Sequence, residues 1–80
     1  MEIELLKGQF EKQEANSLLT QLIDVKIKFH ESKISGDSNE ETIKMREGRI
    51  KELQSELYEL QKFMQKKEGP INLSGSITVS

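Results

Sequence analysis

The sequence contains no cysteine among its 80 residues, and it has a single histidine. Without cysteine, disulfides and thiolate metal sites are excluded, and this composition is typical of a reducing compartment without requiring one. A lone histidine has no second imidazole with which to share a metal ion. We therefore expect no cofactor and no metal site, and we expect His30 to pack between helices.

Long apolar runs are absent as well. No stretch approaches the ~20 apolar residues that span a bilayer, and the N-terminal sequence MEIELLKGQF has acids where a signal peptide carries lysines. We expect a cytoplasmic protein with no membrane partner. The sequence also lacks a glycine-rich phosphate loop, paired histidines, and a nucleophile placed beside a histidine and an acid. It therefore predicts no catalytic residue and no enzyme.

Neither sign of charge dominates, because 12 lysines and arginines stand against 14 acids. Such mixing is typical of helix surfaces that face solvent. No segment is basic enough to attract nucleic acid by charge alone, although basic residues gather near the middle of the chain. The candidates for a weak nucleic-acid contact are Lys44, Arg49 and Lys51. This alternative requires the basic residues near the middle of the chain to form one continuous face.

The apolar residues that are present are placed symmetrically about a point between residues 37 and 38. Pairs such as Leu22 and Leu53 have position numbers that sum to 75. Two antiparallel helices folded at that point would bring these pairs together. The sequence therefore predicts an antiparallel, coiled-coil-like helical hairpin, with Leu22, Val25 and Phe29 of the first helix in the seam.

We expect one domain over residues 1–80, of α+β class but mostly α. Its expected elements, in chain order, are a strand at about 2–6, a helix at about 11–34, a loop at 35–39, a helix at about 39–67 and a strand at about 71–79. Gly8 is expected to end the first strand, and Pro70 the second helix. Ser38 and Glu41 have the spacing of a capping box. Since a hairpin returns the chain to its start, the terminal strands should pair antiparallel, within one chain or between two.

The first helix carries more apolar surface than one seam needs. A second row lies beside the first, and a chain this short buries such surface with difficulty on its own. Exposed apolar patches usually mark interfaces. We therefore expect this row to be the oligomer interface of a homodimer or higher oligomer, which would form a four-helix bundle. The row consists of Leu19, Ile23, Ile27, His30 and Ile34.

These patterns favour a small non-enzymatic module for protein–protein interaction or scaffolding. Its expected partner is a second copy of itself, with another protein as a further candidate. A small nucleic-acid-binding regulator is the alternative. A more remote alternative is an enzyme whose site forms between subunits, which would need a polar pocket around Lys26 and His30.

Overall fold

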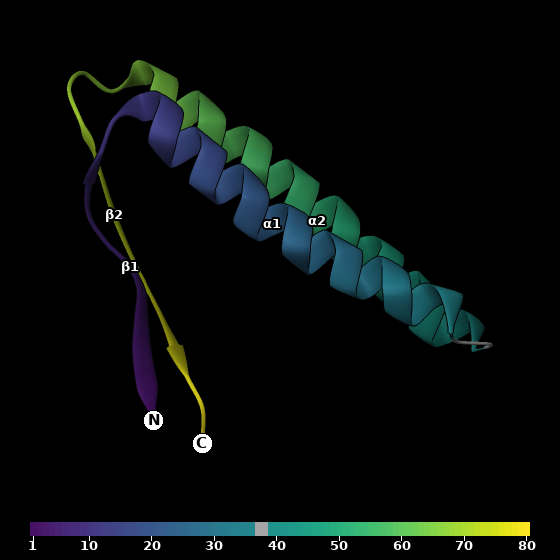
Figure 1. Ribbon diagram of the computed structural model, residues 1–80. Coiled ribbons are helices and arrows are strands. Elements are labelled where there is room, and N and C mark those ends of the chain that lie inside the picture. Colours follow the sequence, from purple (N-terminus) through teal and green to yellow (C-terminus); the bar gives the residue numbers. More distant parts are fainter. Residues whose placement is uncertain (37–38) are drawn as a thin grey trace.

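The structure is a computed structural model, and it describes residues 1–36 and 39–80. Its elements, in chain order, are β1 (Glu2–Phe10), α1 (Lys12–Ser35), α2 (Glu40–Lys66) and β2 (Ile71–Thr78). The two helices form a hairpin, and the two strands pair antiparallel at its open end (Figure 1). The predicted mostly α, α+β class and the helical hairpin are therefore confirmed.

Local side-chain hydrogen bonds cap the N-termini of both helices. Asn39 Oδ1 accepts a hydrogen bond from the Glu41 N–H at 2.9 Å, as N-cap side chains do. The expected cap, Ser38, lies outside the described residues. At the start of α1, Glu14 Oε1 accepts a hydrogen bond from the Glu11 N–H at 3.1 Å, which is one half of a capping box. At the start of each helix, a backbone N–H group thus finds a hydrogen-bond acceptor in a nearby side chain, without tertiary contacts.

The first strand is longer than expected, because it continues through Gly8 to Phe10. The expectation that Gly8 ends the strand is wrong. Between Glu4 and Leu6, β1 carries one extra residue relative to β2, and such a bulge shifts the alternation of side chains by one. Leu6 and Phe10 therefore join the same face as Ile3. Gly8 lies between them at a φ of 140°, a region that glycine tolerates at no steric cost.

The pair of strands, which we call the ribbon, has one apolar and one polar face. The register places Ile3 opposite Ile77 and Phe10 opposite Ile71. With the two glycines Gly8 and Gly75, the apolar face consists of Ile3, Leu6, Phe10, Ile71, Leu73 and Ile77. The polar face consists of Glu2, Glu4, Lys7, Gln9, Asn72, Ser74, Ser76 and Thr78. A two-stranded ribbon of this kind is marginal in water unless another layer covers its apolar face.

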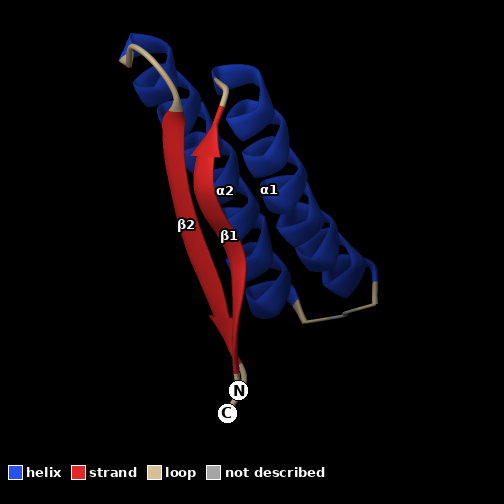
Figure 2. Cartoon of the chain, turned by 60° about the vertical axis from the view of Figure 1, so that its left-hand side comes forward, coloured by secondary structure: helices blue, strands red, loops and turns tan. Residues whose placement is uncertain are grey.

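Most of the core lies where the ribbon meets the helices, a region we call the junction. Ala15 of α1, Met64 of α2 and Ile71 of β2 form a buried cluster there. The partly buried apolar residues packed against this cluster are Phe10, Leu19 and Leu73. Figure 2 shows the two strands side by side with the helices as a second layer behind them. Away from the junction, the ribbon diverges from the helices (Figure 1).

Candidate interaction surface

The row that was expected to form the oligomer interface lies along the seam between the helices. Its members Leu19, Ile23, Ile27, His30 and Ile34 are all half-buried. Ile23 and Ile27 line a hollow together with Leu57 of α2. Part of this row is therefore covered by α2 within one chain, and its assignment to the oligomer interface stays a prediction.

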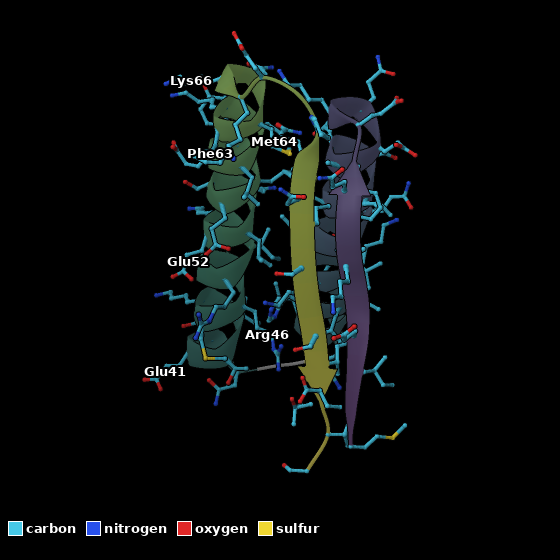
Figure 3. The ribbon with its side chains drawn as sticks, turned by 90° about the vertical axis from the view of Figure 1, so that its left-hand side faces the viewer. Glu41, Arg46, Glu52, Phe63, Met64 and Lys66 are labelled. Carbon is cyan, nitrogen blue, oxygen red and sulfur yellow. The ribbon has the colours of Figure 1, made fainter. Side chains whose placement is uncertain are left out.

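A hydrogen bond between side chains of the two helices crosses this seam. Nη1 of Arg46 lies 3.1 Å from Nδ1 of His30. Because a guanidinium can only donate, Nδ1 of His30 accepts this hydrogen bond. Figure 3 shows Arg46 and Met64 projecting from α2 into the space between the helices. His30, which an enzyme site between subunits would have used, is thus engaged within the hairpin.

The row that was expected to fill the seam is instead the more exposed one. Val25 is 67% exposed and Phe29 is 52% exposed. The cause is a small shift in how the helices face each other. Gln61 Nε2 donates to Asn16 Oδ1 at 3.0 Å, so the position numbers of these partners sum to 77 and not to the expected 75. A shift of one residue turns a helix by about 100°, which is enough to bring the other row into the seam.

The exposed row includes a stripe that is buried at the junction. Ala15, Leu22 and Phe29 are seven residues apart, so they lie on one face of α1. Along this stripe the exposure rises from 0% through 37% to 52%. Ala15 packs against Ile71 of the ribbon, whereas the ribbon has diverged from α1 further along (Figure 1). The stripe is therefore apolar throughout but fully covered only at its first residue, Ala15.

The apolar face of the ribbon shows the same gradient. Ile71 is 5% exposed at the junction, while Ile77 is 46% and Val79 is 60% exposed toward the free end. On β1, Ile3 is 47% exposed. Since the buried end of this face packs against α1, the face is turned toward the helical layer. The open apolar surface, as we call it, consists of Ile3, Leu22, Phe29, Ile77 and Val79.

The second helix adds further exposed apolar side chains. Leu60 is 38% exposed and Phe63 is 62% exposed, and both line a hollow of about 530 Å³ on α2. Nζ of Lys67 lies 5.5 Å from the centroid of the Phe63 ring. These side chains leave apolar area on α2 that one chain does not cover.

The three basic candidates for nucleic-acid contact are not brought onto one face. Lys44 and Lys51 are seven residues apart and share a side of α2, but Arg49 lies about 200° around the helix from Lys51. Arg49 also pairs with Glu52, with Nη1 and Oε2 3.3 Å apart. These three residues therefore do not form the continuous basic face that the alternative requires.

Other charged side chains lie on the solvent-exposed faces of the helices. Nζ of Lys28 and Oδ2 of Asp24 are 3.0 Å apart on the exposed side of α1. The hydrogen bond to the Asp24 carboxylate, together with its charge, raises the pKa of Lys28 above its ordinary value. Among the residues that the structure describes, no three histidines or acids lie where they could hold a metal ion. No helix in the described part of the chain is long and apolar enough to cross a bilayer.

Among the described residues, the candidate site is thus an exposed apolar surface. The hollow of about 350 Å³ near the junction includes Asn16 and Gln61 in its lining, and the side-chain amides of these two residues are hydrogen-bonded to each other. Comparisons of the chain with protein-family models, curated proteins and solved structures found no match.

Proposed function

We propose that this protein is a small non-enzymatic interaction module that assembles with itself through its open apolar surface. The observation that carries this proposal is the accessible surface of one chain, which is 6448 Å². A compact monomer of 9.2 kDa would expose about 4,900 Å² by the scaling of surface with mass. The excess, about 1,500 Å² per chain, matches what each subunit of a stable homodimer buries.

The shape of the chain supports the same proposal. Its radius of gyration over Cα atoms is 15.1 Å, whereas a compact domain of this length would have about 12 Å. Among the described residues, the buried apolar side chains are Ala15, Leu53, Met64 and Ile71. A core this small gives a single chain little stability. A second copy would supply the missing coverage.

In the assembly, we propose that the helical hairpins of two copies pack as a four-helix bundle. The exposed stripe of Leu22 and Phe29 would enter its core, beside the half-buried row from Leu19 to Ile34. Such a bundle presents the mixed charges of the outer helix faces to solvent, where another protein can bind. The nucleic-acid alternative has no observation of its own in its favour.

Charge substitution on the exposed stripe tests this proposal. Phe29→Glu should dissociate the assembly, because the carboxylate would have to lose its hydration without a partner. Tyr58→Glu is the matched control, since Tyr58 is 59% exposed but lies about 200° around α2 from Leu60. Light scattering after size-exclusion chromatography gives the mass of each variant. A wild-type mass of 9.2 kDa at all concentrations, or an unchanged oligomer in Phe29→Glu, would contradict the proposal.

A further inference from the structure

The two strands of the ribbon differ in charge. β1 carries Glu2, Glu4 and Lys7, whereas residues 69–80, which include all of β2, carry no charged residue. In a two-stranded sheet both strands are edges. Edges that avoid further pairing usually carry charges, proline or a bulge, and β1 has both charges and a bulge. Within the ribbon, β2 is therefore the edge without such protection.

The open edge of β2 presents the backbone groups of alternate residues. The Val79 N–H donates to the Met1 carbonyl at 2.8 Å, and the Met1 ammonium donates to the Val79 carbonyl at 2.9 Å. This exchange marks a hydrogen-bonded pair, and such pairs recur at every second residue of an antiparallel ladder. Odd-numbered residues of β2 therefore turn their backbone groups toward β1. Ser74, Ser76 and Thr78 turn theirs toward the open edge.

The sequence of this edge is symmetric about Gly75. Residues whose position numbers sum to 150 match in kind: Ile71 with Val79, Asn72 with Thr78, Leu73 with Ile77 and Ser74 with Ser76. When two copies pair antiparallel about a twofold axis, residues with a constant sum of position numbers face each other. Apolar residues would then meet apolar residues on one face, and polar residues would meet polar residues on the other.

We infer that β2 pairs with β2 of a second copy, antiparallel and centred on Gly75, to give a four-stranded sheet in the order β1-β2-β2-β1. This inference rests on the proposed self-assembly and specifies its geometry. A twofold axis perpendicular to the sheet keeps the apolar faces of both ribbons on the same side. Four strands exceed the number needed for independent stability, and the helices of both copies would cover the single apolar face.

The central position of this sheet has room for the pairing. Gly75 would face Gly75 of the second copy as a non-hydrogen-bonded pair, in which Cα atoms lie about 4.5 Å apart. A Cβ atom built on Gly75 meets nothing within 4 Å in one chain. A Cβ atom points out of the sheet, so the apolar face has room for a side chain at Gly75, and the two-stranded order leaves the other edge of β2 unpaired among the described residues.

Single-cysteine variants of the full chain test the register, because the wild type has no cysteine. Under mild oxidation, Gly75→Cys should give a disulfide-linked dimer, since a Cα separation of about 4.5 Å suits a disulfide. Val79→Cys is the matched control on the same apolar face. Across the proposed axis, its counterpart lies about 27 Å away along the strand, so this variant should stay reduced. Preferential crosslinking of Val79→Cys would overturn the inferred register.

A proline variant tests the edge itself. Ser76→Pro removes an N–H at the open edge of β2 and should weaken the dimer about thirtyfold, because one hydrogen bond per copy is lost. Glu4→Pro, opposite Ser76 in the register, removes an N–H from the outer edge of β1 and should leave the dimer unchanged. Sedimentation equilibrium measures both variants.

The outcomes separate this inference from the proposed function. A wild-type dimer in which Gly75→Cys stays reduced and Ser76→Pro has no effect would overturn β2 pairing while leaving assembly through the helices intact. A wild type that is monomeric at all concentrations would overturn both. Crosslinking of Gly75→Cys with loss of affinity in Ser76→Pro supports both.

Discussion

The junction and the open ends of this molecule are built from the same kinds of residues, yet they differ in what covers them. Ile71 and Ile77 lie on one face of β2, but the first is 5% exposed and the second 46%. Ala15 and Phe29 lie on one stripe of α1 and differ in the same way. The difference arises because the ribbon diverges from the helices. A regular apolar pattern thus specifies an apolar surface, but one chain buries that surface only where the ribbon packs against the helices.

The largest effect is expected at the junction. Ala15→Asp places a carboxylate where the side chain is 0% exposed, and an uncompensated buried charge costs about 3–5 kcal/mol. We expect the ribbon to detach from the helices and the melting temperature to fall sharply, as followed by circular dichroism. Ser17→Asp is the control on the exposed side of the same helix and should melt like the wild type. Equal melting of both variants would show that the junction does not anchor the ribbon.

A smaller effect is expected at the free end of the ribbon, and it should appear in association and not in folding. Ile77→Ser removes a side chain that one chain leaves half exposed and a second copy would cover. The loss is about 1 kcal/mol per copy, or about thirtyfold in the dissociation constant of a dimer. Thr78→Ser, on the polar face, is the control. Sedimentation equilibrium distinguishes the two, and identical constants would show that the ribbon face stays uncovered.

Arg46→Leu tests whether added apolar packing in the helical seam stabilises the chain, as apolar packing does at the junction. Arg46 lies in the seam beside His30, and its buried Nε has no hydrogen-bond partner among the described residues. Leucine would remove this cost and fill the seam, so we expect a stability gain of about 1 kcal/mol in thermal melting. Arg49→Leu, on the exposed side of α2, should give no gain. A loss in Arg46→Leu would mean that its hydrogen bond to His30 contributes more than apolar packing.

The smallest effect is expected on the outer face of α1. Asp24→Asn removes the ion pair with Lys28, whose two side chains are 51% and 72% exposed. Because the folded-state pKa of Lys28 is raised, any stability from this pair is fully present below the ordinary lysine pKa and is lost only as the pH rises through the raised value. Solvent screening makes it small, so the melting temperature at neutral pH should not change measurably. A drop as large as that of Ala15→Asp would refute this.

Local signals predicted much of the fold. The spacing of the apolar residues and Pro70 place the second helix at about 39–67, and the structure has α2 at Glu40–Lys66. Antiparallel pairing of the terminal strands followed from the hairpin alone. The length of β1 did not, because it depends on a bulge between Glu4 and Leu6 that the alternation of residues does not reveal.

The candidate surface was predictable in kind but not in place. The sequence shows that α1 has more apolar residues than one seam can use. Which row enters the seam depends on a register difference of one or two residues, and the hydrogen bonds of His30 and Gln61 show which register the helices adopt. No periodic pattern in the sequence predicts that the ribbon diverges from the helices. This divergence leaves Phe29 and Ile77 exposed although their patterns match those of buried residues.

The most direct test of self-assembly is to measure the mass and the radius of gyration of the wild-type protein together, by light scattering and small-angle X-ray scattering over a range of concentrations. If a second copy covers the open apolar surface, the mass should be at least twice 9.2 kDa and should fall only on strong dilution. A mass of 9.2 kDa at every concentration, with a radius of gyration near 15.1 Å, would show that the extended chain is stable alone and would contradict self-assembly.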